Sequence, residues 1–220
     1  CPTWVHGFHY HVLNYWKIGA DTDDGYKEYR DRDRRRWMRW RHVELSPFIF
    51  GLIYGKHRRD GATIDGYNMM QLYPQMDFER NSGHMHKEDT SAKKGFINML
   101  VRPFRKQPKW LIPENDSKPK SILFRLIDPD TKKKAREYDD EDEEGEDLGG
   151  TIDFRATVFN AYDGDKLIFC FLDETGKWKN VDVEETVGVT VQCLSQGAGT
   201  VKVGNLYMPT TVEEMKKGGE

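Results

Sequence analysis

A chain of 220 residues with 37% hydrophobic and 32% charged side chains can bury a core in one large or two small domains, and this composition excludes collagen-like, coiled-coil and wholly disordered proteins. No apolar run reaches the roughly 18 residues that a membrane-spanning helix needs, which excludes a transmembrane protein. The net charge of −3 hides a contrast, because residues 1–120 hold 22 Lys and Arg against 15 Asp and Glu, whereas residues 121–220 hold 12 against 22. A basic, aromatic first half before an acidic, aliphatic second half indicates either an anionic partner or docking of one half on the other.

The first half predicts an irregular α+β unit over residues 1–106. Aromatic and β-branched residues favour a strand over 8–16. The basic stretch 26–42 lacks Gly and Pro, which predicts a short helix or an irregular segment. Two further strands are expected, with loops and short elements between them over 61–91, and they span 48–54 and 96–104.

Residues 107–120 contain three prolines among polar residues and are predicted to be a linker. Short β-rich runs separated by Gly-containing turns follow over 121–208, which favours a small barrel or sandwich. The runs span 121–127, 151–162, 166–172, 178–183, 187–194 and 200–208. Residues 129–150 include a dense acidic run and are expected to form an exposed flexible loop, which could also occupy the basic half as an internal competitor for phosphate. Residues 209–220 are predicted to be a tail.

The predicted fold class is therefore α+β and β-rich, with an irregular N-terminal unit and a small C-terminal antiparallel β-barrel or sandwich. The chain has three cysteines, which is too few for a disulfide scaffold. Cys170 and Cys193 lie in apolar runs, where a buried free thiol is the common outcome. Cysteine usage favours a reducing compartment, and the sequence does not specify the location further.

The most prominent local feature is the alternation of arginine and tryptophan within Arg32–Arg41. Guanidinium groups bind phosphates and aromatic rings stack on unpaired bases, a combination that single-stranded nucleic-acid surfaces use. We therefore predict a nucleic-acid surface formed by Arg34, Arg35, Arg36, Trp37, Arg39, Trp40, Arg41, Lys56, Arg58 and Arg59. Docking against a protein partner and a purely structural role, with the tryptophans in the core, remain open for the same residues.

Three histidines near the N-terminus are candidate ligands for a metal ion. His6, His9 and His11 lie close in sequence, and imidazole suits zinc. Structural zinc sites need four ligands at closed spacings, however, and the chain has no paired Cys-x-x-Cys motif. Zinc is therefore only a possible cofactor, and no other cofactor is predicted.

Catalysis is not predicted. His84, His86, Glu88 and Asp89 could serve as acid–base groups, but the sequence shows no nucleophile elbow, phosphate-loop signature or dinucleotide fingerprint. The favoured function is non-enzymatic binding of an extended anionic polymer, namely single-stranded DNA or RNA. The alternative is a structural subunit of a large protein assembly, with the Arg/Trp segment as its interface anchor and with self-association possible.

Overall fold

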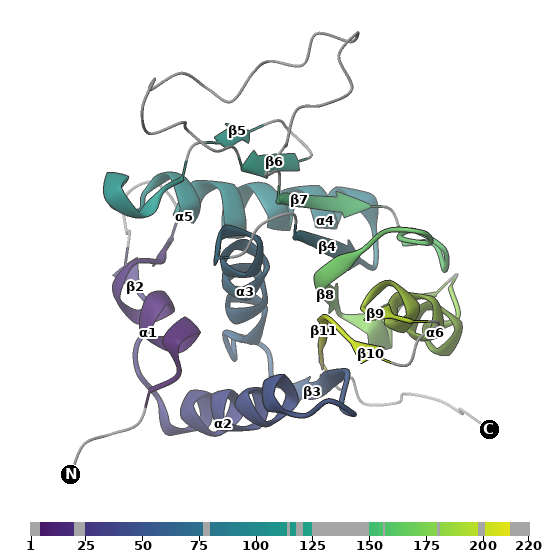
Figure 1. Ribbon diagram of the computed structural model, residues 1–220. Helices are drawn as coiled ribbons and strands as arrows, with labels where there is room; N and C mark the ends of the chain where they lie inside the picture. Colours follow the sequence, from purple (N-terminus) through teal and green to yellow (C-terminus); the bar gives the residue numbers. More distant parts are fainter. Residues whose placement is uncertain are drawn as a thin grey trace, which may run out of the picture.

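The computed structural model describes residues 5–19, 25–76, 80–113, 115–117, 121–124, 150–155, 157–179, 181–197 and 201–211. Within these ranges, seven strands form one sheet in the spatial order β3-β11-β8-β4-β7-β6-β5. Their bounds are β3 Gly51–Lys56, β4 Asn81–His86, β5 Asn115–Ser117, β6 Ser121–Phe124, β7 Thr151–Arg155, β8 Leu167–Asp173 and β11 Asn205–Thr211. Strands β3, β11, β8, β4 and β7 are parallel, and β6 and β5 add antiparallel pairs at one edge (Figure 1).

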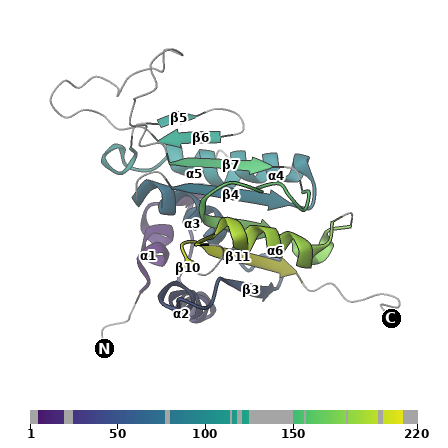
Figure 2. The same cartoon turned by 45° about the vertical axis from the view of Figure 1, so that its right-hand side comes forward.

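Helices cover both faces of the sheet. Their bounds are α1 Gly7–Asn14, α2 Asp31–Leu45, α3 Ala62–Met76, α4 Asp89–Gly95, α5 Arg102–Arg105 and α6 Val183–Cys193, with a π-helix η1 at Phe96–Val101 and 3₁₀ turns η2 at Lys109–Leu111 and η3 at Thr175–Lys177. Figure 2 shows the strands stacked from β5 to β3, with α6 in front of the sheet and α3 behind it. Two small antiparallel pairs lie outside the sheet, β1 (Lys17–Ile18) with β2 (Gly25–Tyr26) and β9 (Ser195–Gln196) with β10 (Val201–Lys202).

Strand β8 supplies side chains to both layers of the core. Phe169 and Phe171 join the apolar cluster beneath α1, α2 and α3, whereas Cys170 and Leu172 join the cluster beneath α6. A strand that is buried on both faces reads as a continuous apolar run, as parallel strands do. Helix α3 approaches β8 closely at Gly66, where a Cβ atom would lie 2.7 Å from the Phe171 ring.

This architecture corrects the predicted fold class. The structure is an α/β fold with a mostly parallel sheet, and neither a barrel nor an antiparallel sandwich forms in the described part of the chain. The error has a clear origin, because fully buried parallel strands and amphipathic helices both carry β-branched residues at close spacing. The predicted strands at 48–54, 121–127 and 166–172 overlap β3, β6 and β8.

Three predicted strands are helical instead. Residues 8–16 fall largely in α1, where Phe8 and Val12 bury one helical face at a spacing of four. Residues 187–194 fall in α6, and the Asp182 carboxylate caps this helix by accepting from the N–H groups of Glu184 and Glu185. Residues 96–104 form η1 and most of α5. The region 61–91, expected to be mainly loops, contains α3 and β4.

The boundary predicted at 107–120 does not separate two sheets. Strands β3 and β4 come from the predicted first unit, and they pair directly with β11, β8 and β7 from the second. The sheet therefore combines the basic and the acidic halves of the chain. The predicted acidic loop at 129–150, apart from Gly150, and the tail beyond residue 211 lie outside the described residues.

Cys170 and Cys193 are buried free thiols, as the sequence indicates, whereas Cys1 lies outside the described residues. None of the helices in the described part of the chain combines the length and apolar character that a bilayer crossing requires.

His84 of β4 makes the stability of the fold depend on pH. Its Nδ1–H donates to the Phe171 carbonyl oxygen at 2.9 Å, and its Nε2 accepts from the Tyr67 hydroxyl at 2.9 Å. Burial lowers the pKa of His84 from 6.5 to about 3. As the pH falls below 6.5, the imidazole therefore becomes protonated in the unfolded chain but stays neutral in the folded chain. This histidine therefore stabilises the fold fully above pH 6.5 and progressively less between pH 6.5 and 3.

We expect the free energy of unfolding to fall with decreasing pH, and His84 alone should lower it by about 2 kcal/mol between roughly pH 6.5 and 5. Urea unfolding at several pH values measures this slope, and His84→Asn should remove the His84 share of it whatever its effect on stability at neutral pH. His9 and His11, whose pKa values burial lowers to about 4, account for a further share. An unchanged slope in the His84→Asn protein would contradict the assignment.

Candidate active site

The carboxyl ends of four neighbouring parallel strands meet at one edge of the sheet, and a polar residue ends each of them. These residues are Lys56 of β3, Thr211 of β11, Asp173 of β8 and His86 of β4. The register pairs Lys56 with Thr211 and His86 with Asp173. Open α/β sheets bind their ligands outside the carboxyl ends of the strands, so this edge is the candidate site.

Lys56 connects three elements at this edge. Its Nζ atom donates to the Thr63 Oγ1 atom of α3 at 2.5 Å and to the Asp173 Oδ1 atom of β8 at 2.7 Å. The Thr63 hydroxyl lies 3.4 Å from the same Asp173 oxygen. Lys56 and Asp173 are both buried. An ammonium, a hydroxyl and a carboxylate, far apart in the sequence, therefore converge at one point.

The loop of residues 57–61 joins β3 to α3 and turns sharply. The Asp60 N–H donates to the His57 carbonyl oxygen at 3.2 Å, and Arg59 and Gly61 have positive φ angles of 61° and 84°. Helix α3 begins directly after Gly61, and the first N–H groups of a helix lack intrahelical acceptors and carry partial positive charge. A strand, a tight loop and a helix N-terminus in this order form a site for phosphate groups.

Two adjacent carboxylates lie at the end of β8, Asp173 as its last residue and Glu174 directly after it. Burial raises the pKa of Asp173 more than the nearby Lys56 lowers it. Burial alone would also raise the pKa of Glu174, but Lys177 and Lys56 outweigh it and hold that pKa below its usual range. The Lys177 Nζ atom lies 2.5 Å from Glu174 Oε2, and Lys56 Nζ lies 4.0 Å from Glu174 Oε1. Glu174 is therefore an ionised carboxylate at the edge of the site.

His86 lies on the other side of Asp173, with its Nε2 atom 4.0 Å from Asp173 Oδ2. Burial lowers the pKa of His86 and outweighs the opposing effect of Asp173 and Glu174. The imidazole is therefore neutral at neutral pH and contributes a hydrogen-bonding group rather than a charge.

A buried cluster of charged residues supports the loop from α2. Arg36 donates to Asp60 at 2.9 Å and to Asp33 at 2.7 Å, and it also bonds Asp65 of α3. Lys27 donates to Asp65 at 2.7 Å. Burial would lower the pKa of Arg36, but Asp65 and the other acidic partners raise it further. The guanidinium is thus fully charged, and it ties α2 to the loop and to α3.

The Arg/Trp segment forms α2, and part of it faces the core rather than solvent. Trp37 and Trp40 are 1% exposed and Arg36 is 2% exposed. Trp37 stacks on the ring of His6, and Trp40 packs edge-on against Phe169. These three side chains cannot form the base-stacking and phosphate-binding surface predicted from the sequence, because they are covered. Lys56 is likewise buried, in the candidate site.

The remaining members of the predicted surface are accessible. Arg34 is half-buried, and the exposed members are Arg35, Arg39, Arg41, Arg58 and Arg59. Their predicted contact with nucleic acid stays a prediction.

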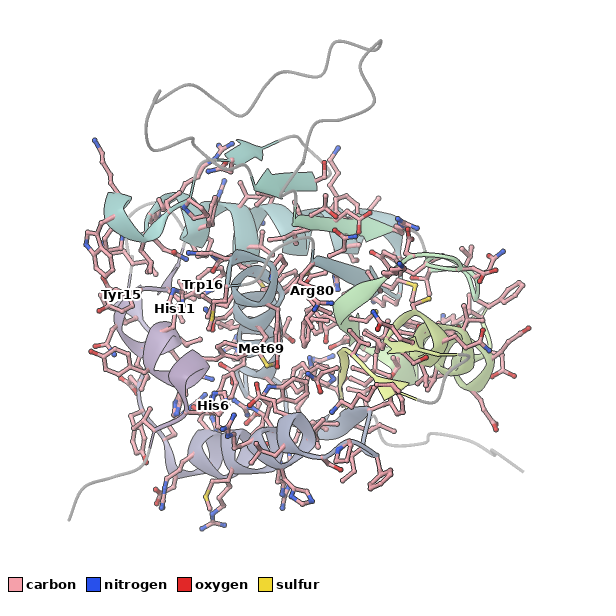
Figure 3. The ribbon with its side chains drawn as sticks, in the orientation of Figure 1. His6, His11, Tyr15, Trp16, Met69 and Arg80 are labelled. Carbon is pink, nitrogen blue, oxygen red and sulfur yellow. The ribbon has the colours of Figure 1, made fainter. Side chains whose placement is uncertain are left out.

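The three histidines considered for zinc have different partners. His6 contacts the Glu44 carboxylate at 2.8 Å, His11 contacts Asn68 at 2.6 Å, and His9 stacks on Trp37. Figure 3 shows His6 near α2 and His11 farther along α1. Within the described ranges, no group of three or more His, Cys, Asp or Glu side chains is arranged to hold a metal ion.

Sequence reasoning missed Thr63, Asp173 and Glu174. It identified the apolar runs of β3 and β8 and proposed Lys56 for nucleic-acid binding, but it did not single out the Asp-Glu pair at the end of β8. Two signals were present: an apolar strand that ends in Asp-Glu, and a Gly-Ala-Thr sequence that opens a helix after a strand. Ala62 stands where the usual phosphate-loop signature has lysine, which concealed the second signal.

No protein-family model matches the sequence, and a comparison with curated proteins finds no match either. Among solved structures, the chain is similar to the large terminase of bacteriophage HK97, with a TM-score of 0.60 and 13% identity over 92% of this chain. The chain spans 36% of that protein. The chain is also similar to the large terminase ATPase domain of a Thermus phage, with a TM-score of 0.48 and 12% identity over 96% of this chain and 71% of that chain. A further similarity is to the large terminase of a thermophilic bacteriophage, with a TM-score of 0.45 and 14% identity over 93% of this chain and 38% of that chain.

The likeness to the HK97 protein corrects the predicted function. A non-enzymatic binder of single-stranded nucleic acid built on a β-barrel, and a structural assembly subunit anchored by its Arg/Trp segment, were the two predictions. The chain instead shares the α/β architecture of a large terminase, and the core of its Arg/Trp segment is buried. The fold shared with a large terminase, in place of the predicted small β-barrel, also contradicts the prediction that the protein is not an enzyme.

Proposed function

We propose that the chain is a nucleoside-triphosphate hydrolase domain that binds the triphosphate between the loop 57–61, the N-terminus of α3 and Asp173. The observation that carries this proposal is the contact of Lys56 with both Thr63 and Asp173 across the carboxyl edge of a parallel sheet. Phosphate-loop hydrolases use the same three chemical groups: a lysine for the phosphates, and a hydroxyl and a strand-terminal Asp for the metal.

The lysine reaches the site by an unusual route. The common signature G-x-x-x-x-G-K-[ST] places its lysine directly before the hydroxyl residue, and here that position is Ala62. Lys56 instead ends β3, at the other end of the loop, and its ammonium reaches the Thr63 hydroxyl. A positive charge is thus supplied at the usual place from a different position in the sequence.

The residues present also fit Mg²⁺, which such hydrolases use with their nucleotide. Thr63 and Asp173 offer a hydroxyl and a carboxylate oxygen 3.4 Å apart, and oxygen ligands of this kind suit a hard divalent cation. When bound, the cation would neutralise negative charge on the phosphates.

The remaining groups have distinct roles in the proposed reaction. The N–H groups that open α3 and the Lys56 ammonium bind and orient phosphate oxygens. The Glu174 carboxylate follows Asp173 and is ionised, so it can orient the attacking water by accepting its hydrogen bond and then accept its proton as a general base. Arg36 positions the loop through Asp60 without contacting the ligand itself.

The sheet order and the likeness to the HK97 protein support a more specific proposal. One strand, β11, separates the Lys56 strand β3 from the Asp173 strand β8. On this basis we propose that the chain is the hydrolase part of a terminase-type motor, with DNA and other proteins of a packaging assembly as its partners.

Phosphate release from ATP tests the proposal. We expect Mg²⁺-dependent hydrolysis that falls about 100-fold in Glu174→Gln, because the amide cannot accept the proton of the attacking water. ATP binding should persist in this variant, as measured by equilibrium dialysis. Glu184→Gln, at the exposed start of α6, is the matched control and should retain the wild-type rate. Equal rates for wild type and Glu174→Gln would contradict the assignment of Glu174.

A further inference from the structure

A pocket lies beside Asp173 and Glu174, since its lining includes Lys177 and Trp178, which contact these two residues. It has a volume of about 480 Å³ and lies between the residues that follow β4, β7 and β8. Its lining includes Lys87, Glu88, Thr157, Lys177, Trp178 and Lys179. Three ammonium groups against one carboxylate give this pocket a positive balance, which suits an anion.

Two lining residues hold the Asp173–Glu174 pair directly. The Lys177 Nζ atom lies 2.5 Å from Glu174 Oε2, and the Lys177 N–H donates to the Glu174 carbonyl oxygen at 2.8 Å. The Trp178 indole N–H donates to the Asp173 carbonyl oxygen at 3.1 Å. A ligand that moves the Lys177 ammonium therefore acts directly on the Glu174 carboxylate, and one that moves Trp178 acts on the backbone at Asp173.

Glu174 is also held in an uncommon backbone conformation. Its φ and ψ angles of 56° and 36° lie in the left-handed region, which is unfavourable for a non-glycine residue. The side chain is thus fixed at both ends, by its backbone and by Lys177. A carboxylate whose oxygen already accepts from an ammonium is a weaker acceptor for the proton of a water molecule.

We propose that this pocket binds phosphate groups and that the bound phosphate draws Lys177 away from Glu174, which frees the carboxylate for hydrolysis. The regulatory part of this inference rests on the proposed function. Phosphate is the chemistry that the lysines recognise, and it has two sources, free inorganic phosphate and the phosphodiester backbone of a nucleic acid. In either case the pocket couples an anion outside the active site to the group that orients the water.

Carboxyl-carbon NMR of Glu174 tests the contact without requiring hydrolysis. The resonance is assigned by its absence in Glu174→Gln, and the protein is titrated with inorganic phosphate and, separately, with a thymidine oligonucleotide. We expect a saturable shift toward the position seen in Lys177→Met, which lacks the ammonium and should not respond further. A response to the oligonucleotide alone identifies a phosphodiester ligand, whereas a response to both identifies any phosphate.

One double variant distinguishes this pocket from the loop 57–61, where phosphate would also bind, and one single variant is its control. The double variant Lys87→Met/Lys179→Met should weaken the response at least about tenfold, because it removes two of the three positive charges. Lys109→Met, a lysine of η2 outside the pocket lining, should respond as the wild type does. An undiminished response in the double variant would place the anion elsewhere and overturn the inference.

Hydrolysis rates complete the test. The oligonucleotide or phosphate should raise the wild-type rate by a factor of about 3–10, and Lys177→Met should show the raised rate with neither present. ATP hydrolysis that ignores both anions, together with an unmoved Glu174 resonance, would overturn this inference and leave the proposed function standing. A Glu174 resonance that responds in a protein without any hydrolysis would support the pocket and overturn the proposed function.

Discussion

Replacing Lys56 by methionine is expected to lower kcat/KM for ATP hydrolysis by about 1,000-fold, because no other lysine contacts the Thr63–Asp173 pair in the described part of the chain. The loss should fall on both nucleotide binding and turnover, since the ammonium is proposed to bind phosphate oxygens in the ground state and in the transition state. Steady-state phosphate release at several ATP concentrations measures both parameters.

Lys56→Met leaves the buried Asp173 carboxylate without its closest cation, so the variant also loses stability. Two substitutions of Thr63 test the same site without removing a buried charge. Thr63→Val keeps the shape and removes the hydroxyl, and it should lose most of the Mg²⁺-dependent activity, whereas Thr63→Ser keeps the hydroxyl and should retain activity. A Thr63→Val protein as active as the wild type would contradict the proposed role of this hydroxyl.

Replacing Arg36 by methionine is expected to reduce the free energy of unfolding by about 3–5 kcal/mol. The substitution leaves Asp33, Asp60 and Asp65 buried with too little positive charge, and removing one partner of a buried ion pair costs more than the pair itself contributes. Urea unfolding measures the loss directly.

Arg35→Met is the matched control for this effect. Arg35 is the neighbouring residue on α2, it is exposed, and its replacement should change the free energy of unfolding by less than about 0.5 kcal/mol. Similar losses in the two variants would mean that the buried cluster does not tie α2 to the loop. A temperature at which Arg36→Met remains folded then allows its ATP hydrolysis to be compared with that of Arg35→Met.

The sequence reveals β3 and β8 because each is an apolar run bounded by turn residues. It misleads at α6, where Val187, Val189 and Val191 alternate as in a strand although Asp182 and the acidic residues after it mark a helix start. The parallel order of the strands is set by contacts between distant segments, so no local pattern could reveal it.

The candidate site depends on the same long-range order. Lys56 and Asp173 are 117 positions apart, and they meet only because β3 and β8 both point toward one edge with β11 between them. The burial of Trp37 and Trp40 is a second example. The spacing of these aromatic residues is compatible with a surface or a core. The packing of Trp40 against the sheet and of Trp37 against His6 and α1 decides between the two.

Calorimetric titration of the protein with ATP, with and without Mg²⁺, tests the central claim most directly. We expect one binding site per chain, an affinity that depends on Mg²⁺, and the loss of that binding in a folded Lys56→Met protein. Absence of binding to the folded wild-type protein, or binding that Lys56→Met leaves unchanged, would contradict the assignment of the phosphate site to the β3–α3 loop.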